Sequence, residues 1–342
     1  MTISTLVVGF GYAAKTFHVP FLTQLADFEI NGVVSSDPAK VNSELPGCAV
    51  YSSLEQAFSS ASFDLVVITT PNHLHSPQAK AALQAGCHVL VEKPFTLNSK
   101  EGEELVTLAK QAGKHLCVFH NRRFDGDFLT IKQLIADDTV GDVKRFESRF
   151  DRFRPNLRQR WREQPGPGAG IFWDLGPHLI DQCIQLWGMP QAVNAHILTQ
   201  RHGGEANDAF EITLFYGAHI ALLGSTPFEA GPTLRFALHG NKGSYRKFAL
   251  DPQEEQLKAG LSFNDPRWAN TPEEEQGKLH TDTSSKIIPT LPGRYIQFYQ
   301  QLADAIQGES PLPADAKTVV PVIQLIELAI ASSQNQRTML VA

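Results

Sequence analysis

The sequence contains little that would indicate a secreted, membrane-spanning or nucleic-acid-binding protein. Its four cysteines include no Cys-x-x-Cys pair, so reduced and mostly buried thiols are expected instead of a disulfide framework. Thirty Lys and Arg against thirty-six Asp and Glu give a net charge of −6, which provides no general attraction for nucleic acid or anionic membranes. No secretory signal is visible and no run approaches about 18 apolar residues, so a cytoplasmic protein without a membrane-spanning helix is expected.

The composition is that of a globular chain, and its first part alternates two kinds of segment. With 342 residues, 42% hydrophobic and 19% charged, the chain can form two domains or one large α/β unit. Helical patterns at 76–85 and 99–112 each end before a glycine, and short apolar runs lie between the helical patterns. Strands that alternate with helices build a doubly wound parallel sheet. The expected strands are 3–8, 29–34, 65–69, 88–91 and 116–119.

Beyond residue 140 the hydrophobic period changes to two. In segment 143–153, Phe146, Ser148 and Phe150 alternate with charged residues, which predicts a strand with one buried face. The turn at 240–243 predicts a hairpin, and the polar stretch 251–292 is interpreted as a long surface excursion. This half is therefore expected to be α+β with a mainly antiparallel sheet. Its further strands are expected at 193–199, 210–216, 219–223, 234–239 and 245–250, and its closing helices at 294–307 and 315–333.

A glycine-rich hexapeptide, GFGYAA, follows the first expected strand directly. Gly9 allows a tight turn, Gly11 lets the backbone approach a pyrophosphate, and the small Ala14 lets helix and strand pack closely. The following helix would direct its N–H groups at the phosphates. The motif predicts a Rossmann dinucleotide-binding domain at residues 1–122, followed by an α+β substrate-binding and oligomerisation domain at 123–342.

The end of the second strand bears on the choice of cofactor. Enzymes that prefer NAD place Asp or Glu there to hold the ribose 2′-OH, whereas this chain has the neutral Ser35. Ser35, Ser36 and the nearby Lys40 could accept a 2′-phosphate, which favours NADP(H). Two alternatives stay open: the serines cap the next helix, or Asp37 reaches the ribose of NAD(H).

Two further motifs, together with the glycine loop, resemble the Gfo/Idh/MocA family of nicotinamide-dependent sugar and polyol oxidoreductases. They are TTPNHLH at 69–75 and VEKP at 91–94, and the match extends over nearly the whole chain. The runs at 120–125, 150–155 and 160–163 are similar to the subgroup that includes NADP-dependent scyllo-inositol dehydrogenase. The cofactor-binding residues expected from the motifs and the resemblance are Gly9, Phe10, Gly11, Tyr12, Ala13, Ala14, Ser35, Ser36, Lys40, Thr70, Pro71, Asn72, His75, Glu92, Lys93 and Asn121.

The resemblance implies that Lys93 lies beside the nicotinamide and that the bond before Pro94 is often cis. A lysine at the carboxyl end of a parallel strand would also project into the ligand crevice, where its ammonium can stabilise a developing alkoxide. A second family signature spans 168–181, and the resemblance makes His178 the proton acceptor, with Asp174 beside it. Asp174 and His178 are four residues apart and share one helix face. Asp181 is interpreted as a structural acid.

The remaining polar residues are assigned more locally. His73 and His75 lack a third ligand at a recognisable spacing, so no metal site is expected. Seven arginines lie between 144 and 162 among acidic residues, which indicates a solvated strand face with ion pairs. Of these, one or two are expected to reach substrate or a neighbouring subunit. The expected substrate-binding residues are Lys93, Arg154, Arg162, Asp174 and His178.

Three functional interpretations follow from these residues. The favoured one is an NADP-dependent or NAD-dependent dehydrogenase that acts on a cyclic polyol or sugar, assembled as a homodimer or homotetramer through the second-domain sheet. A non-catalytic regulator that binds dinucleotide and a protein partner is the second, although Lys93, Asp174 and His178 argue against it. The third is a family dehydrogenase for another sugar or small carbonyl substrate.

Overall fold

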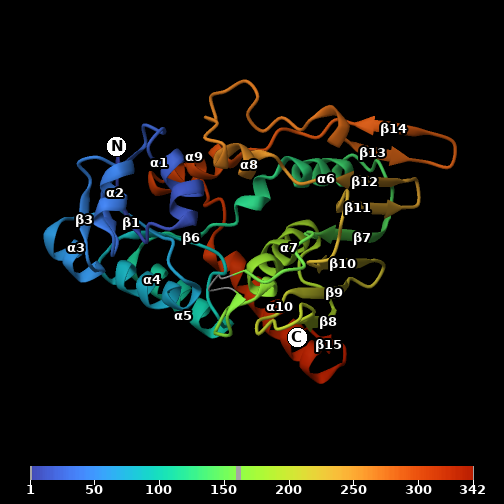
Figure 1. The fold of residues 1–342 in the computed structure, drawn as a ribbon, viewed down its shortest axis with the longest axis horizontal. Helices are drawn as coiled ribbons and strands as arrows, with labels where there is room; N and C mark the ends of the chain where they lie inside the picture. Colours follow the sequence, from blue (N-terminus) through green and yellow to red (C-terminus); the bar gives the residue numbers. More distant parts are fainter. Residues whose placement is uncertain (1, 159–162, 342) are drawn as a thin grey trace. The chain divides into compact units, whose positions relative to one another are not determined.

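A computed structural model describes residues 2–158 and 163–341, which fold into two compact units. Unit 1 comprises Met1–Asn121, Glu254–Asp265 and Tyr295–Val320, and unit 2 comprises Arg122–Gln253, Pro266–Arg294 and Pro321–Ala342. The sequence-based boundary at residue 122 leaves both later segments of unit 1 in the second domain. Each unit is built around one sheet (Figure 1).

Unit 1 contains a six-stranded parallel sheet in the order β3-β2-β1-β4-β5-β6. Leu6, Val7 and the whole of β4 are buried, as expected for a parallel sheet that is covered on both faces. The strand order reverses between β1 and β4, and ligands of such sheets bind outside the carboxyl ends of the strands at this point. The strands are β1 (Ile3–Val8), β2 (Phe28–Val34), β3 (Ala49–Tyr51), β4 (Leu65–Ile68), β5 (His88–Val91) and β6 (Leu116–Val118).

The helices of unit 1 have identifiable end signals. In α5 (Ser99–Ala112), Asn98 accepts a hydrogen bond from the Glu101 N–H, and Gly113 closes the helix with φ of 63°. After the glycine loop the chain forms a π-helix, η1 (Ala14–His18), before α1 (Val19–Leu22). The other helices are α2 (Pro38–Glu44), α3 (Leu54–Ser60), η2 (Asn72–Leu74), α4 (His75–Gln84), α9 (Tyr295–Ile306) and the start of α10 (Ala316–Asn335).

Unit 2 contains a nine-stranded mixed sheet in the order β14-β13-β12-β11-β7-β10-β9-β8-β15. Its neighbours are antiparallel except β10 and β7, which run parallel. Figure 1 shows α7 (Ile171–Trp187) on one side of this sheet. The other elements are α6 (Gly126–Ala136), β7 (Val143–Arg149), β8 (Ala192–Leu198), β9 (Ala209–Phe215), β10 (Ile220–Ser225), β11 (Leu234–Gly240), β12 (Ser244–Phe248), β13 (Gly277–His280), β14 (Ser285–Ile288) and β15 (Met339–Leu340).

The fold class predicted from the sequence is confirmed, but the interpretation of 251–292 as a surface excursion is wrong. This stretch forms α8 (Gln253–Lys258), the 3-10 turn Glu273–Glu275 and the hairpin of β13 and β14. Strands of four residues are too short to give a clear period-two pattern. The strand expected at 143–153 ends at Arg149, although Phe150 remains buried and Phe153 forms an isolated bridge with Phe228.

Helix α10 is long and apolar enough to cross a membrane by length and composition alone, with a mean hydropathy of 1.4. The sequence predicts no membrane-spanning segment because polar residues interrupt every long apolar run. In α10 these polar residues are few, so the mean hydropathy of the helix is still high. Half of the apolar window is buried inside the protein, and Val319, Val322 and Ile326 are fully buried. A core helix of a globular protein has these same properties.

Candidate functional site

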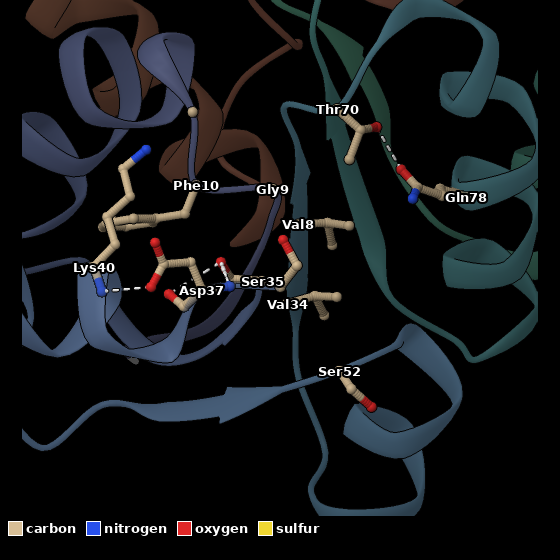
Figure 2. Close-up of a pocket in the computed structure, with 12 residues that line it drawn as sticks. Val8, Gly9, Phe10, Val34, Ser35, Asp37, Lys40, Ser52, Thr70 and Gln78 are labelled. Atoms are coloured by element: carbon tan, nitrogen blue, oxygen red, sulfur yellow. Dashed lines mark hydrogen bonds between the residues drawn. The ribbon is translucent and has the colours of Figure 1, made fainter.

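A cavity of about 380 Å³ lies in unit 1 at the carboxyl ends of β1, β2 and β4 (Figure 2). This is the place where the strand order reverses and where doubly wound sheets bind their ligands. The cavity is therefore the candidate cofactor site. Its lining residues are Val8, Gly9, Phe10, Gly11, Val34, Ser35, Ser36, Asp37, Lys40, Ser52, Thr70 and Gln78.

The glycine loop has the geometry that a dinucleotide site requires. Gly9 has φ of 88°, and a Cβ at this position would lie 3.0 Å from the Thr69 hydroxyl oxygen. A Cβ on Gly11 would meet nothing within 4 Å, so its bare backbone faces open space at the cavity wall. Ala14 is fully buried against the sheet. These residues fit a pyrophosphate that approaches the backbone at Gly11.

The end of β2 is arranged around Asp37. The Asp37 carboxylate caps α2 by accepting a hydrogen bond from the Lys40 N–H at 3.0 Å. Ser35 Oγ in turn accepts from the Asp37 N–H at 3.1 Å. The helix cap is therefore Asp37, and the alternative that the serines cap α2 is wrong. Figure 2 shows the Lys40 side chain extending beside Phe10, with Ser35 at the cavity wall.

Asp37, Ser52 and Gln78 complete this wall, and Ser52 and Gln78 were not expected from the sequence. Gln78, on α4, accepts a hydrogen bond from the Thr70 hydroxyl at 2.6 Å. Ser52 follows β3, a three-residue strand that the hydrophobic pattern does not reveal. The rule that ligands lie at the carboxyl ends of strands would have indicated Ser52 if β3 had been recognised.

Glu92, Lys93 and Pro94 form a turn directly after β5, here called the EKP turn, and buried side chains form hydrogen bonds with it. Its Lys93–Pro94 bond is cis. Glu92 is 8% exposed, and one of its carboxylate oxygens accepts from the Lys93 N–H at 3.1 Å. His75 lies 2.8 Å from the Pro94 carbonyl oxygen through Nδ1 and 2.9 Å from the Thr70 carbonyl oxygen through Nε2. Burial lowers the pKa of His75, although both carbonyl contacts oppose this shift.

In unit 2, α7 positions Asp174 in its first turn and His178 one turn later. Gly170, with φ of 91°, occupies the N-cap position, so Asp174 lies inside the helix. Asn207, from a distant loop, provides the cap: its carbonyl oxygen accepts from the Ile171 N–H and its side chain from the Phe172 N–H, both at 2.8 Å. The hydrophobic period of the sequence predicts this helix. It does not predict the cap, because Asn207 is 35 residues away from Phe172 along the chain.

The inner side of α7 is fixed by buried polar contacts. Asp181 forms a two-point ion pair with Arg123, at 2.7 and 2.9 Å, which confirms its interpretation as a structural acid. Gln182 donates to the Arg122 carbonyl and accepts from Arg235 at 3.0 Å. His178 itself is 4% exposed. These contacts fix the rotation of the helix that carries Asp174 and His178.

The cavity brings together only part of the predicted cofactor set. Arg162 lies outside the described residues, and Arg154 is half-buried with its N–H bonded to the Pro227 carbonyl. Among the described residues no group of three or more His, Cys, Asp or Glu could hold a metal ion. Of the expected cofactor residues, the cavity is lined by Gly9, Phe10, Gly11, Ser35, Ser36, Lys40 and Thr70, and not by Tyr12, Ala13, Ala14, Pro71, Asn72, His75, Glu92, Lys93 or Asn121.

The arginine-rich segment forms ion pairs on the nine-stranded sheet of unit 2, as the sequence predicts. Arg145 pairs with Glu147 at 2.7 Å, and Arg149 pairs with Asp151 and with Glu211. The Arg149 and Glu211 side chains meet over Gly224, where a Cβ would lie 2.6 Å from the guanidinium. The pairs thus cover the face of the sheet where two strands run parallel.

Comparisons with known proteins agree with this geometry. Residues 3–120 match the family model "Oxidoreductase family, NAD-binding Rossmann fold", and residues 132–341 match "Oxidoreductase family, C-terminal alpha/beta domain". The chain is 42% identical to the uncharacterised oxidoreductase YdgJ of Escherichia coli, covering 98% of each chain. It is 38% identical to the scyllo-inositol 2-dehydrogenase (NADP(+)) IolW of Bacillus subtilis, covering 99% of this chain and 96% of the relative.

Solved structures resemble the whole chain equally well. The structure of yvaA from Bacillus subtilis has a TM-score of 0.95 at 37% identity and covers 100% of this chain and 99% of its own. YPO2259 from Yersinia pestis has a TM-score of 0.93 at 42% identity, covering 100% and 97%. The glycine loop, the cavity at the strand ends and both family matches lead to one conclusion. The chain belongs to the Gfo/Idh/MocA family and is an NAD(P)-binding oxidoreductase.

Proposed function

We propose that this enzyme moves hydride reversibly between NADP(H) and a secondary hydroxyl of a cyclic polyol, with an inositol as the first candidate. The observation that carries the proposal is the 38% identity, over nearly the whole chain, to an NADP-dependent scyllo-inositol 2-dehydrogenase. A D-glucoside 3-dehydrogenase of Escherichia coli, 24% identical over 98% of this chain, makes sugars the next substrate class to test. Both substrate classes present a ring carbinol as the reacting group.

The preference for NADP rests on the chemistry at the end of β2. Ser35 and Ser36 offer hydroxyls and Lys40 offers a positive charge at the wall of the cavity. The Asp37 carboxylate is turned to its own helix, where it accepts from the Lys40 N–H. A 2′-phosphate gains from hydroxyl donors and a nearby ammonium, whereas an NAD site needs a carboxylate directed at the ribose.

The proposed chemistry divides the work between two side chains. The bound cofactor would supply the hydride acceptor, while the protein provides position and electrostatics. Lys93, at the end of β5, would hold the substrate oxygen with its ammonium and stabilise the charge that develops there. His178 would take the hydroxyl proton, and Asp174, one turn earlier on α7, would orient the imidazole or bind a substrate hydroxyl.

The experiment is a screen of inositols, other cyclic polyols, aldoses and glucosides with NADP and with NAD, following the absorbance of the reduced nicotinamide. We expect a cyclic polyol to be the best substrate and kcat/KM to be about tenfold or more higher with NADP than with NAD. Failure of every polyol and sugar, in a protein that still binds NADPH, would overturn the proposal in favour of a non-catalytic regulator. Turnover with NAD alone would overturn the cofactor assignment.

A further inference from the structure

Three side chains that the proposed chemistry does not use form a buried chain of hydrogen bonds in unit 1. His18 Nε2 lies 3.0 Å from Glu92 Oε1, and His18 Nδ1 lies 3.1 Å from the Tyr299 hydroxyl. Tyr299 donates its own proton to the Phe17 carbonyl. His18 and Tyr299 are fully buried and Glu92 is 8% exposed. The second oxygen of Glu92 accepts from the Lys93 N–H, so the chain ends at the lysine backbone.

The hydrogen bonds around His18 are best satisfied when both of its ring nitrogens carry a proton. Because the Tyr299 proton goes to the Phe17 carbonyl, the Tyr299 oxygen accepts a proton from His18 Nδ1. The other oxygen of Glu92 is an acceptor for the Lys93 N–H, as expected for an ionised carboxylate. Both nitrogens of His18 then donate, so a cationic imidazole faces an anionic Glu92.

The charge states of the two partners agree with this assignment. Burial alone would raise the pKa of Glu92, but the hydrogen bond and charge of His18, with Lys93 and His75 nearby, lower it below its ordinary value. Burial and the Glu92 carboxylate raise the pKa of Tyr299 well above its usual range, so its hydroxyl keeps the proton. The Phe119 ring packs on His18 with centroids 4.4 Å apart, and His18 is fully buried.

The position of this chain connects two parts of the cofactor site. His18 ends the π-helix that starts at Ala14, the last residue of the glycine loop, and Glu92 begins the EKP turn. Tyr299 joins from α9 and stacks on Phe21 with centroids 4.8 Å apart. A π-helix inserts one extra residue per turn and is found mostly where it serves a site. Here it brings His18 to Glu92.

We propose that His18, Glu92 and Tyr299 are positioning residues that set the orientation of the EKP turn, and thereby of the Lys93 ammonium relative to the nicotinamide. This inference rests on the proposed function, in which Lys93 holds the reacting oxygen. The ion pair with His18 fixes the position of the Glu92 carboxylate, which accepts a hydrogen bond from the Lys93 N–H. This bond orients the Lys93 peptide, and the peptide orientation determines the direction in which the Lys93 side chain points. On the other side of the turn, His75 holds the Pro94 carbonyl.

The test compares variants that keep shape but change one contact. Glu92→Gln removes the charge. His18→Gln carries an amide N–H far enough along its side chain to reach Glu92, whereas the shorter His18→Asn does not. His88→Gln is the matched control, because His88 accepts a backbone N–H at the opposite end of the same strand, β5. Tyr299→Phe has Tyr245→Phe, another buried tyrosine, as its control.

The expected result is a loss of kcat, counted per NADPH-binding site, of about ten- to hundredfold in Glu92→Gln and His18→Asn, because small misplacement of a catalytic group is costly. His18→Gln should recover much of this loss, and both controls should keep wild-type kcat. NADPH affinity should stay within about threefold of wild type, since the phosphate loop is unchanged. Equal losses in His18→Gln and His18→Asn, or loss only of NADPH binding, would overturn the positioning role.

Two readouts need no substrate and separate this inference from the proposed function. Nitrogen-15 spectra should show that both His18 ring nitrogens donate hydrogen bonds in the wild type and that only one does in Glu92→Gln. The emission of bound NADPH should change in the same direction in Glu92→Gln and in Lys93→Ala. If no polyol or sugar is turned over but both readouts behave as stated, the proposed function fails and the positioning stands. A neutral His18, or unchanged NADPH emission, overturns the positioning itself.

Discussion

Ser35 is the residue on which the proposed cofactor choice depends most directly. It lies at the end of β2 in the cavity wall, with Lys40 exposed beside it. Ser35→Asp would put a carboxylate against the 2′-phosphate, and two like charges at contact distance repel by more than about 1.4 kcal/mol when partly buried. We therefore expect the NADP to NAD ratio of kcat/KM to fall by about tenfold or more, as measured with the best substrate of the screen.

Asp37→Asn is the control for this prediction. The amide oxygen can still cap α2 by accepting from the Lys40 N–H, while the negative charge is removed. If Asp37 only caps the helix, the ratio should stay at or above its wild-type value. A loss of NAD turnover in Asp37→Asn, together with an unaltered NADP to NAD ratio of kcat/KM in Ser35→Asp, would mean that Asp37 binds the ribose 2′-OH of NAD.

Lys93 and His178 should differ in how their loss responds to pH. Lys93→Ala removes a preorganised charge and should lower kcat by roughly a hundredfold or more. His178→Ala should lose about two to four powers of ten, and this loss should shrink as pH rises because hydroxide can partly replace the base. Lys80→Ala and His202→Ala, both exposed, serve as controls for the two changes. Near-normal kcat and an unchanged pH profile in His178→Ala would contradict the base assignment and turn attention to Asp174.

Helix α7 depends on a cap that is 35 residues away along the chain. Asn207→Ala removes the acceptor of the Phe172 N–H and should lower the free energy of unfolding by about 1 kcal/mol, as N-cap losses usually do. Because the same turn carries Asp174, kcat should fall more than NADPH affinity. Chemical denaturation and kinetics check both. Asn335→Ala, which removes an exposed hydrogen bond at the end of α10, should change neither.

At the scale of the whole molecule, the face of the nine-stranded sheet opposite to α7 indicates self-association. The pairing register puts Leu198, Phe248 and Ile287, all exposed, on the same face as Arg149 and Glu211. Exposed apolar side chains among ion pairs are typical of a surface that another subunit covers. We propose a symmetric homodimer or homotetramer joined through this face.

Light scattering over a dilution series tests the proposed assembly. A constant dimer or tetramer mass at micromolar protein is expected, and Leu222→Lys, in the middle strands of the same face, should shift it toward the monomer. Leu157→Lys changes an exposed apolar residue outside the sheet and should leave the mass unchanged. A wild-type monomer at micromolar concentration would exclude the assembly.

Local patterns predicted the elements that have strong periods and clear ends. The strands Ile3–Val8 and His88–Val91 and the helix Ser99–Ala112 have the predicted bounds, because buried β-branched runs, an Asn cap and a closing glycine are local signals. The short strands and helices after residue 250 were missed because four residues carry too little periodicity. The sequence predicts an ordinary helix after Gly11, whereas the structure has a π-helix at Ala14–His18, because the extra residue of a π-helix has no signature in the composition.

The sequence by itself determined the glycine loop, the EKP motif and the order of strands and helices, since each depends on residues that are neighbours along the chain. Only the tertiary structure decided that Gln78 joins the cavity and that His18 meets Glu92, 74 residues away. Such meetings depend on which strands lie side by side and on how helices pack against them. The order of the strands and the packing of the helices depend on how the apolar surface of the whole chain is buried, so no short stretch of sequence can predict these contacts.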